Sequence, residues 1–264
     1  VLFWANRFPV FPLQHWSPVY FNIKELRVMS KILTNHPTGR VNRLICSICV
    51  VVTSSLQVLG TTYYVNNTTT NGDVYTTAIG NDANDGLSPS TPKLTVTNLL
   101  SSYTMTGGVL VLIDTGTYSN YTVTVNHSGV PTNPLTFRGS TNSNAGGTVF
   151  NRGNSSFDVW SLPSVSNIVV RDMTFRGGRD AIQLNNSPGV RLTRLTAISN
   201  ARHGFYAFFN SHNTVIQNCI SAQNADFAIH LQSSTNCSIN SSVLWGNLGL
   251  RFRTTLAPAY VSNC

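Results

Sequence analysis

The sequence predicts an all-β fold, a parallel β-helix in which each coil holds about 23 residues. A long repeat, short alternating strands and regularly spaced turns support this prediction. From about residue 165 onward, five segments align, and equivalent residues recur at steps of 22, 24, 23 and 22. One aligned column contains Val170, Leu192, Ile216, Ile239 and Val261. Stacked repeats of this length bury a continuous core that no single repeat could form.

Each repeat also contains a second short strand: "AIQL", "GFYA", "AIHL" and "GLRF". Strict alternation of apolar and polar residues indicates strands with one buried face. Asn200, Asn224 and Asn247 fall in register at the turn before these strands, where Asn tolerates left-handed backbone. Cys219 and Cys264 share the inward column of the first strand, so we expect buried thiols there. The period is too short for a propeller blade, and the frame of a leucine-rich repeat is absent.

Composition favours a secreted protein rich in strands and turns, because only 10% of the residues are charged. The net charge of +8 is uneven. Residues 1–60 carry +5, and the remaining 204 residues carry 11 basic and 8 acidic groups, or +3. This mild balance does not favour a nucleic-acid partner, and none is expected.

The first 60 residues have the order of an export signal behind an upstream leader. Residues 1–28 lack Met and are interpreted as a leader that is not part of the native protein. Residues 29–60 contain a basic region, the apolar core "LICSICVVV" and a polar stretch, and predict a signal peptide. The apolar run is too short to span a membrane, so no stable insertion is expected after cleavage. We therefore expect a secreted or cell-surface protein whose β-helix domain covers residues 61–264.

The segment "STPKLTVTNLLSSY" predicts a short amphipathic helix that caps the open end of the solenoid. Thr91 is the expected N-cap and Pro92 the first helical residue. The segments "GGVLVLIDTGTY", "YTVTVNHSG", "NPLTFRG" and "GGTVFNRG" follow as the first, less regular coils.

The outward residues of the second strand set form two columns that suit a glycan. The first column contains Gln183, Tyr206, His230 and Arg251, and the second contains Asn185, Phe208, Gln232 and Arg253. Aromatic rings stack on sugar faces, and guanidinium groups bind uronate carboxylates in bidentate fashion. These columns predict a substrate-binding face formed by Tyr206, His230, Arg251, Arg253, Gln183 and Gln232. The alternative is a solvated sheet face without a ligand.

The motifs "GNDANDGLSPSTPKLTV", "GGVLVLIDTGTY" and "NPLTFRG" resemble the N-terminal signature of secreted right-handed parallel β-helix proteins of the pectate-lyase-like superfamily. The resemblance spans residues from Tyr63 to the C-terminus and implies the right-handed fold. It implies little about activity, because the superfamily contains lyases, hydrolases, epimerases, phage tailspikes and adhesins. The sequence stops in a strand, so we expect the β-helix to be incomplete at its C-terminus.

A narrower resemblance concerns the polygalacturonase-type hydrolases. Asp180 matches the second Asp of their Asp-Asp motif, and His203 matches their His-Gly motif. The pattern departs from the motif where Arg179 replaces the first Asp and Arg253 replaces Lys. Inverting hydrolysis also needs two carboxyl groups about 6.5–9.5 Å apart. Asp180 and Asp226 lie two coils apart, at roughly 10 Å by the strand spacing, which is slightly too far.

β-Elimination at a uronate residue needs a base and a cation that neutralises the carboxylate, but no second carboxylate. His203, Asp180 and Arg202 are the candidate catalytic residues, with a contact expected between Asp180 and His203. We therefore favour lyase chemistry if the protein is an enzyme. The alternatives are a non-catalytic, adhesin-like surface module and a polygalacturonase-like hydrolase.

A calcium ion is the one cofactor that the sequence indicates. Asp82 and Asp85 lie in "NDANDG", whose spacing faintly resembles a calcium loop. An ordinary turn rich in Asp, Asn and Gly is the competing interpretation. The expected partner remains a polysaccharide, with uronate residues as the proposed recognition feature.

Overall fold

The computed structural model describes residues 60–253 and 259–264. The predicted leader, and the predicted signal peptide apart from its last residue, lie outside the described residues. Residues 58–264 belong to one compact unit. In the described part of the chain, no helix is long and apolar enough to cross a membrane.

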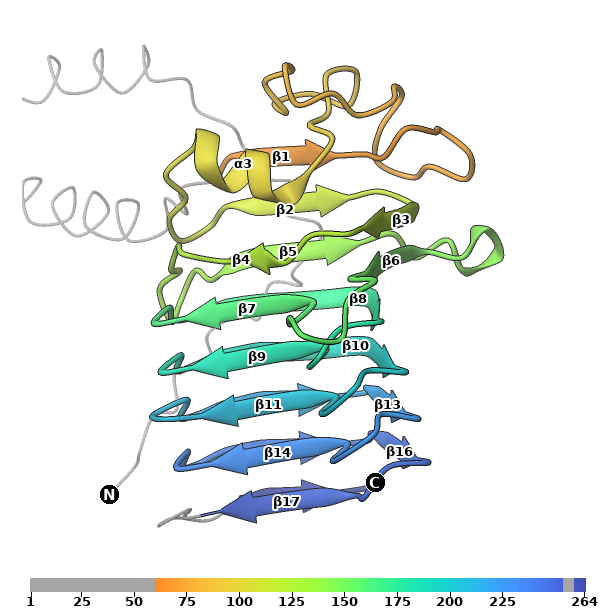
Figure 1. Cartoon of the computed structure of the whole chain (residues 1–264). Helices are drawn as coiled ribbons and strands as arrows, with labels where there is room; N and C mark the ends of the chain where they lie inside the picture. Colours follow the sequence, from red (N-terminus) through yellow and green to blue (C-terminus); the bar gives the residue numbers. More distant parts are fainter. Residues whose placement is uncertain (1–59, 254–258) are drawn as a thin grey trace, which may run out of the picture. The chain divides into compact units, whose positions relative to one another are not determined.

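The described strands stack coil upon coil and pair only in parallel, as Figure 1 shows. The main path of the large sheet contains β1 (Thr62–Val65), β2 (Leu110–Ile113), β5 (Leu135–Gly139), β8 (Ile168–Arg176), β10 (Arg191–Ile198), β12 (Val215–Gln217), β15 (Ser238–Asn240) and β18 (Tyr260–Ser262). Branches of this sheet are β3 (Gly116–Ser119), β6 (Thr148–Asn151), β13 (Ile220–Ala222) and β16 (Val243–Trp245). The six-stranded sheet contains β4 (Val123–Thr124), β7 (Trp160–Pro163), β9 (Ile182–Asn185), β11 (Phe205–Phe208), β14 (Ile229–Gln232) and β17 (Leu250–Arg253).

Strand register confirms the predicted repeat. Val170 pairs with Leu192, Leu192 with Ile216, Ile216 with Ile239, and Ile239 with Val261. In the six-stranded sheet, the predicted outward columns are also register neighbours from β9 to β17. A one-residue slip would expose every buried side chain of a strand, so the apolar pattern fixes this register.

Left-handed residues turn the chain at the corners of the coils. One corner column contains Asp172, Arg194, Asn218, Ser241 and Asn263, with φ of 63°, 52°, 54°, 48° and 53°. A second column contains Asn167, Gly189, Asn213 and Asn236, with φ of 54°, 72°, 56° and 54°. Single residues in this region change the chain direction without interrupting the stacking of the strands.

A ladder of three asparagines, of which Asn200 and Asn224 are buried, links successive coils. The backbone N–H of Asn200 and its side-chain Nδ2 donate to Asn224 Oδ1 at 3.0 and 2.9 Å. The backbone N–H of Asn224 donates to Asn247 Oδ1 at 2.8 Å. The register predicted for these three residues is therefore confirmed, and the hydrogen bonds satisfy polar groups of Asn200 and Asn224 that water cannot reach. The left-handed backbone expected at the asparagines lies one residue earlier, at Ser199 and Gln223, with φ of 55° and 52°.

The capping helix, α3 (Val96–Ser102), begins later than predicted. Its N-cap is Thr95, whose side chain accepts a hydrogen bond from the N–H of Asn98 at 3.1 Å. Thr91 is not the cap, because Lys93 forms a parallel bridge with Val65 of β1, so no helix begins there. A further short 3₁₀ helix is η1 (Ser143–Ala145).

Aromatic rings fill the core beneath the six-stranded sheet. The side chain of Trp160 is fully buried and meets Phe137, Phe150 and Phe175 edge-on, at centroid distances of 5.3, 5.1 and 5.6 Å. Cys219 and Cys237 are buried free thiols. The prediction of a buried thiol is confirmed for Cys219 and wrong for Cys264, which is exposed on the last described coil, where no further described coil covers it.

Candidate functional site

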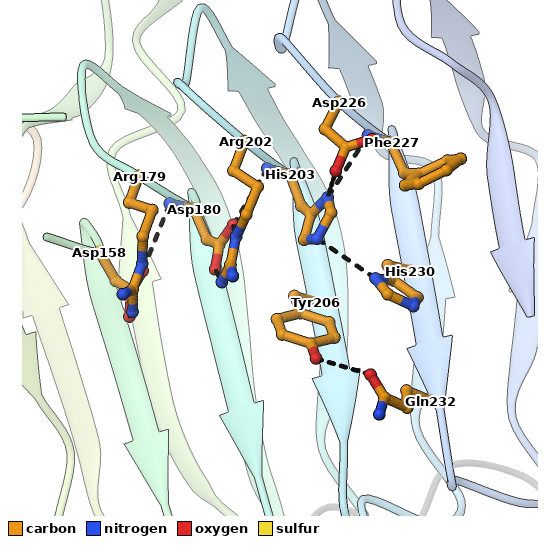
Figure 2. Close-up of polar contacts among 10 residues, drawn as sticks. All are labelled: Asp158, Arg179, Asp180, Arg202, His203, Tyr206, Asp226, Phe227, His230 and Gln232. Carbon is orange, nitrogen blue, oxygen red and sulfur yellow. Dashed lines mark hydrogen bonds and ion pairs between the residues drawn. The ribbon is translucent and has the colours of Figure 1, made fainter. Parts of the chain in front are cut away.

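The candidate site lies on the six-stranded sheet around β9, β11 and β14, where Figure 2 shows its side chains. Asp158, Asp180 and His203 each stand two residues before β7, β9 and β11, so the repeat places them in one column. Arg179, Arg202 and Asp226 directly precede Asp180, His203 and Phe227, which occupy this column in three successive coils. Each of these three side chains therefore reaches back toward the previous coil.

Two arginines bind the carboxylates of the preceding coil in bidentate fashion. Arg179 Nε and Nη2 donate to Asp158 at 2.9 and 2.8 Å. Arg202 Nε donates to Asp180 Oδ1 at 2.8 Å, and Arg202 Nη2 donates to Asp180 Oδ2. Burial raises the pKa of Asp158, against the effect of the Arg179 hydrogen bond. Because Asp180 is fully buried, it is a structural anchor for Arg202.

The expected contact between Asp180 and His203 exists through the main chain. The backbone N–H of His203 donates to Asp180 Oδ1 at 3.0 Å, while the ion pair of Asp180 is with Arg202. The His203 side chain is only 4% exposed, and Figure 2 shows it turned toward the next coil.

Asp226, His203 and His230 form a chain of polar contacts. His203 Nδ1 lies 3.5 Å from Asp226 Oδ2, and His203 Nε2 lies 3.2 Å from His230 Nδ1. The backbone N–H of Phe227 donates a hydrogen bond to His203 Nδ1 at 3.4 Å. Burial lowers the pKa of His203, and burial together with His203 and Arg251 lowers the pKa of His230 to about 4. His230 is therefore neutral at pH 7.

The second nitrogen of His230 has no hydrogen-bond partner among the residues that the structure describes. His230 Nε2 is buried and unpaired, and the residue as a whole is 5% exposed. Such a group is costly unless a ligand or water satisfies it, so orphaned polar atoms mark candidate functional sites.

Tyr206 forms the aromatic centre of the site. Its ring stacks on His230 at 4.7 Å and on Phe208 at 4.6 Å between centroids. The guanidinium of Arg202 lies 5.1 Å from the ring centroid, and the phenol donates to Gln232 Oε1 at 2.8 Å. Burial is the main cause of the raised pKa of Tyr206.

Two exposed arginines extend the site on β17. Arg251 stands beside His230 in register and lies 4.9 Å from the ring centroid of Phe227, and Arg253 stands beside Gln232. Within residues 60–253 and 259–264, neither arginine forms an ion pair with a carboxylate. The face therefore offers cations that are free to bind an anion.

The structure brings most of the predicted residues together. Tyr206, His230, Gln232 and Arg251 are adjacent, Gln183 lies in register with Tyr206 on β9, and Arg253 adjoins Gln232. The sequence reasoning missed Asp158, although it precedes its strand by the same two residues as Asp180. It also missed Phe227, which supports Arg251 and contacts both histidines.

The two predicted calcium ligands lie elsewhere, in the loop before α3. Asp82 accepts hydrogen bonds from the N–H groups of Leu94 and Thr95 and from the Thr95 hydroxyl, at 2.9–3.0 Å. Asp85 Oδ1 accepts hydrogen bonds from Leu87 and Thr91. These donors suit an anion, so the contacts do not fit a calcium ligand set, and the described residues contain no cluster of three or more metal-binding side chains. Calcium binding stays a prediction.

The sequence matches the family of the right-handed β-helix region over residues 108–264, which is more than half of the chain. The chain belongs to the right-handed β-helix family. This membership agrees with the parallel coils described above and, as for other widespread folds, leaves the activity open.

Solved structures resemble this β-helix in fold. One is a rhamnogalacturonan lyase, with 15% identity and a TM-score of 0.39 over 77% of this chain and 62% of that one. Another is an alginate lyase from Paenibacillus sp. str. FPU-7, with 12% identity and a TM-score of 0.34 over 61% of this chain and 72% of that one. The β-helix thus spans less than two thirds of the rhamnogalacturonan lyase. No curated protein matches the sequence.

Proposed function

We propose that this β-helix binds an acidic polysaccharide along its six-stranded sheet and cleaves it by β-elimination. The observation that carries the proposal is the juxtaposition of Tyr206 and His230 with the unpaired cation of Arg251. A secreted or cell-surface location belongs to the same proposal, because extracellular matrices and cell walls contain such polymers.

Binding would use aromatic and cationic groups of neighbouring coils. Tyr206 and Phe208 stack on each other, and the half-exposed edge of this pair offers an apolar platform to a sugar ring. Arg251 and Arg253 would bind uronate carboxylates, whose planar geometry matches the guanidinium fork. Gln183 and Gln232 would bind hydroxyl groups at either side.

Elimination would start with removal of the proton next to the uronate carboxylate. In the tautomer in which His203 Nδ1 carries a proton and donates it to Asp226, the hydrogen bond from the Phe227 N–H to this nitrogen is given up, and His203 Nε2 can accept the Nδ1 proton of His230. The lone pair of His230 then lies on the orphaned Nε2, where it can take the substrate proton. Asp226 and His203 are positioning residues in this arrangement, because His203 is too buried to touch substrate.

The remaining steps need an acid and a cation. Arg251 would stabilise the negative charge that develops on the uronate carboxylate after proton removal. The carbon–oxygen bond at the neighbouring carbon breaks, a carbon–carbon double bond forms, and Tyr206 would protonate the leaving oxygen. His230 Nε2 is buried in this structure, so a side chain on the face must rotate before substrate reaches it.

Hydrolysis fits this geometry less well. Asp158 and Asp180 are both bound by arginines in bidentate fashion, and Asp180 is fully buried. Asp226 is the more accessible carboxylate, with a side chain that is 33% exposed. A general acid and a general base thus cannot both be supplied by these three residues.

A non-catalytic, adhesin-like β-helix is the second candidate function. The burial of His230 Nε2 favours it, because a base that substrate cannot reach would leave a face that only binds. Both functions share the glycan-binding face, so one experiment separates them.

The experiment incubates the protein with polygalacturonate, alginate or chondroitin, with and without Ca²⁺, and follows the ultraviolet absorbance of the unsaturated product. We expect product from at least one polymer, and loss of about a hundredfold or more of its rate in His230→Gln. His212→Gln is the matched control, because His212 lies in a turn outside the site and bonds Thr235. Absence of product on all three polymers, with binding retained, would reject elimination in favour of the adhesin-like function for these ligands.

A further inference from the structure

A second group of charged side chains lies on the large sheet. Arg138 on β5 and Arg171 on β8 are register partners, so their backbones are about 4.8 Å apart and their side chains leave the same face. From the next coil, Arg194 Nε and Nη2 bind the two carboxylate oxygens of Asp172 at 2.6 and 2.9 Å. Asp172 Oδ2 also lies 3.7 Å from the Nε atoms of both Arg138 and Arg171. We call these four residues the arginine cluster.

Positive charge in the arginine cluster is not balanced. Three guanidinium groups surround one carboxylate, which gives a net charge of 3 − 1 = +2. At 3.7 Å the two Nε atoms are too far from Asp172 for hydrogen bonds, and both are buried without a partner. In the part of the chain that the structure describes, no second carboxylate pairs with these arginines. Like charges directly opposite on neighbouring strands are unfavourable, so an additional anion would stabilise this arrangement.

The arginine cluster is also held in place by its surroundings. Asp172 and Arg194 occupy the left-handed corner column with φ of 63° and 52°, where the later coils have Asn, Ser and Asn. Asp tolerates this conformation, but Arg194 gains no local advantage from it, and such strain collects at functional sites. The guanidinium of Arg138 lies 5.7 Å from the ring centroid of Tyr75, whose hydroxyl donates to the carbonyl of Gly139 at 3.0 Å.

Ligands can reach the outer parts of these arginines. The side chains of Arg138, Arg171 and Arg194 are 34%, 33% and 48% exposed, whereas Asp172 is only 5% exposed. A ligand approaching from solvent would therefore meet guanidinium groups before the carboxylate. The arrangement selects anions with two or more oxygens, which match the guanidinium fork.

We propose that the arginine cluster is a second anion-binding site, which takes a carboxylate or sulfate group of an acidic glycan. One bound anionic group would reduce the net charge of the cluster from +2 to +1. The site belongs to the large sheet and needs none of the residues of the six-stranded sheet. It rests on the proposed function only for the choice of an acidic glycan as ligand.

Calorimetric titration of the full chain tests this site. The ligands are hexagalacturonate, which has carboxylates alone, a κ-carrageenan hexasaccharide, which has sulfates alone, and neutral cellohexaose. The background protein carries Arg251→Gln and Arg253→Gln, which disable the six-stranded sheet. We expect it to bind at least one acidic ligand, and Arg138→Gln with Arg171→Gln to weaken that binding by about tenfold or more.

Controls separate this site from general charge and from the proposed function. Arg176→Gln removes an exposed arginine of β8 without an ion pair and should leave the affinity within about twofold. If the double variant does not fold, Arg171→Lys keeps the charge, loses the fork and should still weaken binding several-fold. Failure of the background protein to bind either acidic ligand, while the unmodified chain binds, would overturn this site and leave the proposed function intact. The proposed site would also be overturned if Arg176→Gln weakened binding as much as the double variant does, or if cellohexaose bound as tightly as the acidic ligands.

Discussion

Removal of Arg202 should destabilise the β-helix strongly, because it leaves a buried carboxylate without its partner. Asp180 is fully buried, and its two oxygens accept both Arg202 hydrogen bonds and the N–H of His203. In Arg202→Ala, the His203 N–H is the one of these hydrogen-bond donors that Asp180 keeps. Breaking a buried ion pair in this way costs about 3–5 kcal/mol of the free energy of unfolding. Asp180→Asn should cost less, about 1–2 kcal/mol, because Arg202 is 35% exposed and can reach water.

Urea denaturation at pH 7 measures these differences as shifts in midpoint at constant m value. Arg194→Ala is the matched control: Asp172 loses a bidentate arginine but keeps Arg138 and Arg171 at 3.7 Å, so the loss should stay near 1 kcal/mol or below. The reasoning would be refuted if Arg202→Ala cost no more than Arg194→Ala, or if Asp180→Asn cost more than Arg202→Ala.

Two further predictions concern the histidines and the asparagine ladder. Folding lowers the pKa of His230 from 6.5 to about 4. Between these two pH values the unfolded chain therefore binds more protons than the folded chain. The free energy of unfolding should fall by up to about 3 kcal/mol as the pH drops from 6.5 toward 4. Urea midpoints at pH 7.5 and 4.5 measure this loss; it should shrink in His230→Gln, and an unchanged loss would contradict the assignment. Asn224→Ala should cost about 2–3 kcal/mol, because it leaves the buried N–H of Asn200 without an acceptor. The exposed Asn144→Ala should cost little in the same thermal or urea measurement, and equal losses would argue against the ladder.

The register of the coils could be predicted from the sequence because inward apolar residues show two spacings. They alternate with polar residues within each strand, and equivalent ones recur about every 23 residues from coil to coil. Val170 and Leu192 are equivalent in sequence and paired in the structure, and the same holds for Tyr206 and His230. A one-residue slip would bury polar side chains, and the coil period excludes larger shifts, so the two patterns together select one alignment.

The ion pairs of the candidate site could not be predicted in the same way. Asp180 and His203 occupy equivalent positions, which suggested a direct side-chain contact, but the arginine before His203 is long enough to reach back one coil and take the carboxylate. The column arrangement gives neighbouring backbones, while the length and charge of each side chain decide which atoms meet.

Two further features could not be predicted from the local sequence: the start of the capping helix and the left-handed corner at Arg194. Thr91 and Pro92 have the residue types of a helix start, yet the bridge between Lys93 and β1 prevents a helix there, and the N-cap is Thr95. The corner column has no turn signature at Arg194, because Arg is not a residue type that favours the left-handed conformation. Tertiary pairing determined the conformation in both cases.

A crystal structure with bound hexagalacturonate would test the central claim, that the six-stranded sheet is the glycan-binding face, most directly. We predict a sugar ring against Tyr206, a carboxylate bound by Arg251, and a uronate C–H directed at His230 Nε2. An ordered ligand that leaves all three residues of this sheet untouched would contradict the claim.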